Sequence, residues 1–177
     1  KDITDDRLEF QFENLKDWSI FNNFKDIDKW YQKVIDKKAQ LKLVNIYLDF
    51  QKSKKCIGLS EDMLLAMLDL TCSDLELSIY RTVSEDSKET TGFTFIVRSG
   101  NTATYLIGWS NDEGRRQQSN YLLLWEAINM AKNQGLVWFD MGGVSSNTPK
   151  GIVHFKTGVN AIFYKNVGEF YAAPKIL

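Results

Sequence analysis

The sequence contains very little cysteine and histidine. Its 177 residues include two cysteines, Cys56 and Cys72, and one histidine, His154. Structural zinc sites and disulfide frameworks need several such residues at short spacing, so we expect neither a metal site nor a disulfide. A Ser-His-Asp nucleophile system would have to use His154, and there is no G-x-S-x-G elbow to hold its serine. This cysteine usage is typical of a reducing, cytoplasmic setting.

Long apolar runs and an excess of one charge are also lacking. No apolar run approaches the ~20 residues of a transmembrane helix and no signal-peptide pattern is visible, so we expect no membrane span. The 22 basic and 23 acidic residues leave a net charge of -1. This balance disfavours a general polyanion-binding surface, although a local basic patch is compatible with it.

The apolar content is that of a folded chain. Hydrophobic residues make up 44% of the sequence, enough for a real core rather than a disordered segment. At this length we expect one domain or slightly more. The chain starts with Lys1 rather than methionine, so we expect a fragment or a processed chain, and a partner domain before it stays an open alternative.

The most informative segment covers residues 104–158. It begins with mixed aromatic and aliphatic residues, as a buried strand does, and continues with a polar stretch at residues 111–118 that predicts a loop. Apolar residues at helical spacing follow, with Ser119 as the expected N-terminal cap and Gly135 as the expected stop. A second strand then closes at residues 140–143. Such a strand, helix and strand form a βαβ unit, so the two strands should be parallel.

We expect a ligand at the carboxyl ends of these two strands, beside the N-terminus of the helix. Two groups of residues meet there, one around the start of the helix and one at the end of the second strand. They are Gly114, Arg115, Arg116 and Ser119 in the first group, and Asp140, Gly142 and Gly143 in the second.

The remaining segments predict a mixed α/β (α+β) sheet. Three alternating stretches joined by short turns, the last of them the first strand of the βαβ unit, predict an antiparallel meander. Two helices precede the meander, the second beginning at Ser60. A short helix capped by Asn147 or Thr148, with Pro149 just inside it, follows the βαβ unit. The other expected elements are a strand at residues 8–12, a helix at 26–53, strands at 75–83 and 91–98, and two short strands within 161–171.

Four short motifs follow one another within residues 60–171. They are Ala103, Tyr105 and Gly108; Trp125-Glu126-Ala127-Ile128; Asp140, Gly142 and Gly143; and Phe155, Lys156 and Gly158. In this order they resemble the GNAT acyltransferase superfamily, and more narrowly its Fem-type branch, the peptidoglycan-bridge aminoacyltransferases and related envelope-glycan acyltransferases. The sequence departs from the pattern at Val159-Asn160, where the family usually has an aromatic residue and a glycine.

The resemblance implies a GNAT-like mixed sheet, in which an antiparallel meander is followed by a βαβ unit with flanking helices. We place the acyltransferase core at residues 60–177 and an N-terminal strand and helical region at residues 1–59. Fem-type proteins usually contain two GNAT-like halves, and this chain has room for one, which best matches the second. Residues 1–59 are therefore expected to be either the start of the domain or a remnant of a partner half.

The resemblance also implies an N-acyltransferase that moves an acyl or aminoacyl group from an activated donor to an amine of a cell-envelope precursor or sugar. Because no nucleophile system is found, we expect the amine to attack the donor directly, with no permanently bound cofactor. Two co-substrates stay open as donors, acyl-CoA and aminoacyl-tRNA, so tRNA is a candidate partner beside a small-molecule or glycan-precursor acceptor. The sequence does not predict the oligomeric state.

Three other functions are compatible with the same residues. One is a degenerate GNAT domain that acts as a binding or scaffold module. Another is an acyl-CoA-dependent N-acetyltransferase of a small amine. The third is an isolated part of a larger enzyme that is inactive until its other half is present.

Two residues are candidates for catalysis. Asp140 has the chemistry to orient an amine or accept its proton, and the alternative is that it only caps the turn at Gly142 and Gly143. Those glycines allow a tight turn and a close approach of backbone to ligand. Lys156 matches a lysine that the family uses near the acyl donor, and an ordinary surface lysine is the alternative.

Five side chains are candidates for binding. Arg115 and Arg116 are suited to pair with a phosphate of the donor next to the helix amides, although the segment lacks a clear pyrophosphate signature and an ordinary solvated loop is the alternative. Tyr105, Trp109 and Tyr164 are expected to line an acceptor pocket. For Tyr105, packing in the core is the alternative.

Overall fold

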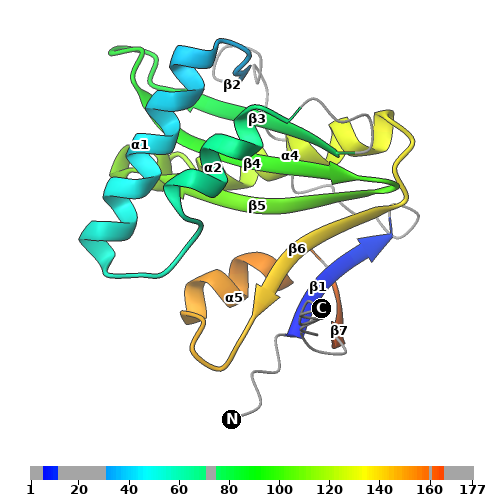
Figure 1. The fold of residues 1–177 in the computed structure, drawn as a ribbon. Helices are drawn as coiled ribbons and strands as arrows, with labels where there is room; N and C mark the ends of the chain where they lie inside the picture. Colours follow the sequence, from blue (N-terminus) through cyan, green and yellow to red (C-terminus); the bar gives the residue numbers. More distant parts are fainter. Residues whose placement is uncertain (1–5, 12–30, 71–74, 160, 166–177) are drawn as a thin grey trace, which may run out of the picture.

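The computed structural model describes residues 6–11, 31–70, 75–159 and 161–165, which form one sheet with helices on both faces (Figure 1). The helices are α1 (Lys37–Lys54), α2 (Glu61–Leu68), α3 (Asp112–Arg116), α4 (Ser119–Asn133) and α5 (Lys150–Thr157). The strands are β1 (Asp6–Gln11), β2 (Tyr31–Lys33), β3 (Leu75–Val83), β4 (Thr90–Ser99), β5 (Thr102–Ser110), β6 (Trp138–Val144) and β7 (Ile162–Lys165).

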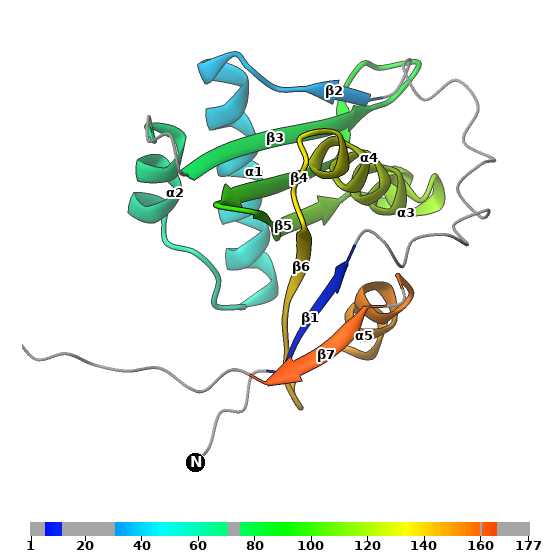
Figure 2. The same cartoon turned by 90° about the vertical axis from the view of Figure 1, so that its right-hand side faces the viewer.

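The sheet has the strand order β2-β3-β4-β5-β6-β1-β7. Neighbouring strands are antiparallel except β5 and β6, which run parallel and are joined through helix α4. Helix α4 covers one face of the sheet, and α1 and α2 cover the other (Figures 1 and 2). The antiparallel meander, the βαβ unit and the mixed α/β class predicted from the sequence are therefore confirmed.

Alternating side chains of β3 and β4 build a core on each face of the sheet. Successive strand residues point to opposite faces, so each strand contributes to both cores. The core on the α4 face includes Tyr80, Ile96, Leu123, Ile128 and Phe139. The core on the α1 face includes Leu43, Leu64, Ile79, Phe93, Phe95 and Ile107.

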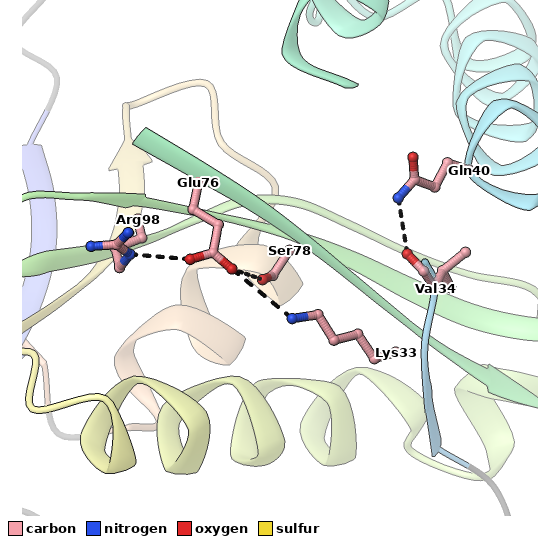
Figure 3. Close-up of polar contacts among 6 residues, drawn as sticks. All are labelled: Lys33, Val34, Gln40, Glu76, Ser78 and Arg98. Carbon is pink, nitrogen blue, oxygen red and sulfur yellow. Dashed lines mark hydrogen bonds and ion pairs between the residues drawn. The ribbon is translucent and has the colours of Figure 1, made fainter. Parts of the chain in front are cut away.

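A polar network joins β2, β3 and β4 near one edge of the sheet (Figure 3). Glu76 on β3 accepts a hydrogen bond from Arg98 Nε on β4 at 3.3 Å and lies 4.0 Å from the ammonium of Lys33 on β2. Gln40 of α1 donates to the Val34 carbonyl at 3.0 Å, which ties the start of α1 to the segment after β2. Partly exposed ion pairs contribute only ~0–1 kcal/mol each, so the network helps to set register more than stability.

The parallel strands β5 and β6 separate along their length. They pair at three positions, from Thr102 opposite Trp138 to Thr104 opposite Asp140. Beyond these positions β5 continues along β4 and β6 along β1, and α5 lies near the opening (Figure 1). Within the described residues, no strand therefore pairs with one edge of the second half of β5.

A β-bulge at Leu106 changes which face of the sheet the later residues of β5 meet. Ile96 of β4 pairs with Tyr105 and Phe95 pairs with Ile107, so Leu106 is the extra residue. Tyr105 consequently packs in the core on the α4 face, whereas Ile107 packs in the core on the α1 face.

The first helix is shorter than the sequence predicted. It begins at Lys37, because the carboxylate of Asp36 accepts a hydrogen bond at 2.7 Å from a backbone amide in the first turn. Within the predicted helix at residues 26–53, β2 pairs with β3 instead, and the ring of Tyr31 stacks on Tyr80 at 5.1 Å. The first residues of that predicted helix lie outside the described part of the chain.

The polar stretch at residues 111–118 is mostly a short helix, and the prediction of a loop is wrong. Asn111 accepts a hydrogen bond from the Gly114 amide at 2.8 Å and so starts α3. Gln118, with a φ of 58°, connects α3 to α4, and no side chain caps α4. Ser119 is the first residue of the helix and is buried, so the prediction that it caps the helix is also wrong.

The boundaries of β6 and α5 also differ from the prediction. Strand β6 extends to Val144 because it pairs with β1, so residues 140–143 lie inside the strand rather than at its end. Pro149 occupies the N-cap position of α5 and is not inside the helix. Thr148 accepts a hydrogen bond from the Ser145 amide at 2.8 Å and does not cap α5.

Several predicted positions are confirmed. Ser60 caps α2 through its hydroxyl oxygen, and Gly135 follows the end of α4 with a φ of 73°. Strand β1 covers all but the last residue of the predicted strand at residues 8–12, and that last residue lies outside the described part. Strand β7 is one of the two short strands expected within residues 161–171, and residues 166–171 lie outside the described part.

Candidate active site

A cavity of about 470 Å³ lies where β5 and β6 separate. Its walls come from β5, from α3 and the start of α4, from α5 and from α1, which are far apart in the sequence. The residues that line it are Tyr47, Phe50, Tyr105, Leu106, Ile107, Gly108, Ser110, Gly114, Arg115, Gln118, Asn120, Tyr121, Gly151, Ile152, Phe155 and Lys156.

Lys156 connects α5 to β6 at the wall of this cavity. Its partly buried ammonium donates a hydrogen bond to the carbonyl of Gly143 at 2.7 Å. Gly142 has a φ of 73°, where a side chain would be strained, and a Cβ there would lie 3.5 Å from Lys156 Nζ. The left-handed backbone therefore favours glycine at position 142, directly beside the residue whose carbonyl binds the lysine.

Asp140 lies in β6 and does not line the cavity. Its carboxylate is buried, and Oδ1 accepts a hydrogen bond from the Gly142 amide at 2.7 Å. This bond supports the left-handed backbone at Gly142. Such a bond is what we expect if Asp140 only caps the turn, which was the alternative to a catalytic role. A role in orienting an amine or accepting its proton stays a prediction.

Only one of the two predicted arginines reaches the cavity. Arg115 lines it, with Nη1 donating to the Ser110 carbonyl at 2.9 Å and Nη2 bound to the Asp112 carboxylate. Arg116 is exposed on α3 and Ser119 is buried in α4, and neither lines the cavity. Phosphate binding by the arginine pair stays a prediction, and part of the hydrogen-bonding capacity of Arg115 is already used by Ser110 and Asp112.

Three aromatic rings meet beside the cavity. The Phe155 ring lies 5.9 Å from that of Tyr105 and 5.1 Å from that of Tyr121. The hydroxyl of Tyr105 occupies the space where a side chain at Gly108 would start, since a Cβ there would lie 1.8 Å from it. Burial raises the pKa of Tyr105, and a hydrogen bond with Thr94 opposes this shift only in part. Tyr105 is therefore a neutral part of the wall at physiological pH.

The other two aromatic residues predicted for an acceptor pocket do not line the cavity. Trp109 stacks on Phe93 at 5.1 Å in the core on the α1 face, because the bulge at Leu106 turns it away from the side of Tyr105. Tyr164 lies in β7, outside the cavity wall. Of the three, only Tyr105 reaches this site.

Residues 80–177, more than half of the sequence, match the model of the FemAB family. The chain belongs to the FemAB family. The resemblance to the Fem-type branch is thereby confirmed. No curated protein sequence matches this FemAB chain.

Two solved structures share the fold of this FemAB chain. The crystal structure of FemX matches with a TM-score of 0.66 at 11% identity, covering 92% of this chain and 60% of FemX. The structure of L-PGS from Bacillus licheniformis matches with a TM-score of 0.59 at 14% identity, covering 93% of this chain and 59% of L-PGS. The chain thus spans about three-fifths of the length of each, and at these identities the likeness is one of fold.

The cavity of the FemAB chain includes residues that sequence reasoning did not select. Tyr47 and Phe50 reach it from α1, and no local pattern links that helix to β5. Asn120 directly follows Ser119, so the argument from the helix N-terminus that selected Ser119 applies equally to it. Phe155 stands beside Lys156 in the family motif and could have been selected from that motif.

Two further observations concern other kinds of site. Among the residues that the structure describes, histidine, cysteine, aspartate and glutamate nowhere gather in a group of three or more that could hold a metal ion. No helix within that part of the chain combines the length and the apolar character needed to cross a membrane.

Proposed function

We propose that this FemAB chain carries the part of an aminoacyltransferase that binds the aminoacyl end of a charged tRNA and transfers its aminoacyl group to an amine of a peptidoglycan precursor. The observation that carries the proposal is the position of Lys156. It hydrogen-bonds the Gly143 carbonyl at 2.7 Å beside the separated strands and lines the cavity. Membership of the FemAB family and the fold shared with FemX and L-PGS support it.

The reaction we propose is direct aminolysis of an ester. The neutral amine attacks the ester carbonyl, a C–N bond forms, the ester C–O bond breaks, and the released ribose hydroxyl takes up the proton that the amine loses. Negative charge develops on the carbonyl oxygen in the transition state, where fixed donors stabilise it best. The ammonium of Lys156 and backbone amides along the open edge of β5 are the donors that we assign to this task.

The cavity wall favours aminoacyl-tRNA over acyl-CoA as the donor. A CoA pyrophosphate needs several available donors, but Arg115 is engaged with the Ser110 carbonyl and the Asp112 carboxylate, and Arg116 lies outside the wall. The aromatic side chains of Tyr47 and Phe50 suit stacking of a terminal adenine, which is sequence-tolerant and worth ~1–3 kcal/mol per base.

Replacement of Lys156 by methionine tests the proposal. We expect Lys156→Met to lower kcat for transfer from aminoacyl-tRNA by about 10²–10³, as for removal of one oxyanion donor. The assay follows a radiolabelled amino acid from a mixed pool of charged tRNA onto a peptidoglycan precursor. Lys150→Met is the matched control, because Lys150 is exposed at the start of the same helix and does not line the cavity.

Unimpaired transfer by Lys156→Met, with its thermal melting unchanged, would show that the site is placed wrongly. A thermal-shift comparison of acetyl-CoA, longer acyl-CoAs and charged tRNA tests the donor separately, since a ligand that binds only the folded state raises Tm. Stabilisation by an acyl-CoA alone would replace the tRNA donor with a thioester. No stabilisation and no transfer would favour a scaffold module or an enzyme that is active only together with a second half.

A further inference from the structure

Gln118 combines a strained backbone with a place in the cavity wall. Its φ of 58° lies in the left-handed region, where any side chain larger than that of glycine is disfavoured. Lys55 and Lys88 are the other described residues, glycines apart, with a positive φ, and neither lines the cavity. Strained residues cluster at ligand sites, so the position of Gln118 in this wall indicates a role in binding.

The packing on both sides of Gln118 imposes this backbone. Before it, Gly114 of α3 lies so close to β4 that a Cβ there would overlap the Thr91 carbonyl. After it, the buried Ser119 of α4 packs on Gly92, where a Cβ would lie 3.0 Å from the Cβ of the serine. The connection from α3 to α4 is thus held at both ends on consecutive residues of β4, and its turn falls at Gln118.

The side chain of Gln118 is available to a ligand. The residue is exposed and lines the cavity. Its neighbour Gln117 donates to Glu113 at 3.2 Å, whereas the carboxamide of Gln118 bonds to none of the described residues. A carboxamide holds a donor and an acceptor side by side in one plane. It therefore suits a planar ligand edge that presents the complementary pair.

The rest of the wall favours adenine as that ligand. Adenine presents its N6 amino group beside the acceptor N7, and a glutamine carboxamide pairs with both at once. The rings of Tyr47, Phe50 and Tyr121 line the same cavity and suit stacking on the faces of a base. Hypoxanthine presents an oxygen acceptor in place of the amino group, so the same carboxamide cannot satisfy both of its positions.

We propose that the carboxamide of Gln118 binds the edge of the donor's adenine, accepting a hydrogen bond from N6 and donating one to N7. The inference rests on the proposed aminoacyl transfer, in which the donor ends in an adenosine. Coenzyme A also carries an adenine, so it is a second source of the same edge.

Two substitutions at position 118 test the contact. The donors compared are an alanyl-RNA minihelix that ends in adenosine and one that ends in inosine, which carries hypoxanthine. We expect the KM of wild type to be about tenfold lower for the first. Gln118→Gly should lose this preference, because its KM for the adenosine donor rises about tenfold. Gln118→Arg should prefer the inosine donor, since arginine donates to both O6 and N7.

Lys88→Gly is the matched control. It relieves the same left-handed backbone in the turn between β3 and β4, outside the cavity wall. Both glycine variants should melt no lower than wild type, because glycine relieves the strain, and Lys88→Gly should keep the tenfold preference. Equal KM values for the two donors in wild type, or an unchanged preference in Gln118→Gly, would overturn the proposal.

Binding of nucleotides alone separates the adenine site from transfer. By calorimetry, wild type should bind AMP about tenfold more tightly than IMP, and Gln118→Gly should bind the two alike. That result with no transfer by any donor would leave the adenine site standing and reject the proposed function. Transfer from both minihelices at equal KM would retain the function and reject the site. Transfer from acetyl-CoA alone, with a KM that rises in Gln118→Gly, would assign the adenine to coenzyme A.

Discussion

Tyr105 shows how one buried side chain makes stability depend on pH. Burial raises its pKa, so the folded state favours the neutral phenol. In the unfolded chain a tyrosine ionises near pH ~10, so this stabilisation is complete below that pH and is lost as pH rises toward the higher folded pKa. We expect the free energy of unfolding of wild type to fall above pH ~10 more steeply than that of Tyr105→Phe, by about 1.4 kcal/mol per pH unit.

Urea unfolding at pH ~9 and ~11 measures this difference directly. The comparison of slopes matters, because other tyrosines ionise in both proteins over the same range. Burial also raises the pKa of Tyr80, which is present in both. Parallel loss of stability in wild type and Tyr105→Phe would mean that the phenol of Tyr105 is not kept neutral by the fold.

Helix α5 packs on the core of the α4 face through Val153 and Phe155 and is bonded to β6 through Lys156. Phe155 contacts the rings of Tyr105 and Tyr121, and none of the residues of α5 is fully buried. We expect Phe155→Ala to destabilise the protein by ~2 kcal/mol, less than a fully buried phenylalanine would. Hydrogen exchange should accelerate in α5 and remain slow in β3 and β4.

Phe163→Ala is the control for this effect, because Phe163 on β7 is 54% exposed. Its loss should change the free energy of unfolding by less than ~0.5 kcal/mol. Equal protection of α5 amides in Phe155→Ala and wild type would show that the hydrogen bond from Lys156 to β6 is sufficient to dock the helix.

Predictions of elements from the sequence succeeded where the deciding interaction is local. Ser60 caps a helix three residues before the amide it binds, and the meander follows from alternating strands with short turns. They failed where the deciding contact is distant. Tyr31 lies in a strand because β2 pairs with β3, where the ring of Tyr31 stacks on Tyr80. The helical spacing of the nearby apolar residues does not reveal this distant contact.

The same division applies to the candidate site. Lys156 and Tyr105 were selected through the family motif, and both line the cavity. Trp109 was expected to line an acceptor pocket with Tyr105, but one extra residue at Leu106 turns it to the other face of the sheet. A bulge has no signature in a single sequence, so its effect on Trp109 is visible only in three dimensions.

At the scale of the whole molecule, helix α1 belongs to the same core as the rest of the sheet. Leu43 and Val44 of α1 are each 1% exposed, in the same core as Leu64 and Phe93. We propose that residues 1–59 are the start of this domain rather than a separable segment. A chain limited to residues 60–177 would lose those side chains and two strands, so we expect it to show no cooperative urea transition.

Far-ultraviolet circular dichroism and urea titration of the two chains at equal concentration check this expectation. Point substitutions such as Leu43→Ala should lower stability by ~2–5 kcal/mol while the cooperative transition remains. A truncated chain with the same transition midpoint as the full one would mean that residues 60–177 are the complete folding unit.

The place of β1 has a consequence for how this chain is made. Asp6 pairs with Val144 of β6 and with Lys165 of β7, so β1 sits between two strands that follow it at a great distance in the sequence. During translation β1 has neither neighbour until β6 and β7 are made, and such distant pairing makes folding slow. Until then its backbone is an open edge, so chaperones and aggregation compete for this strand on the ribosome.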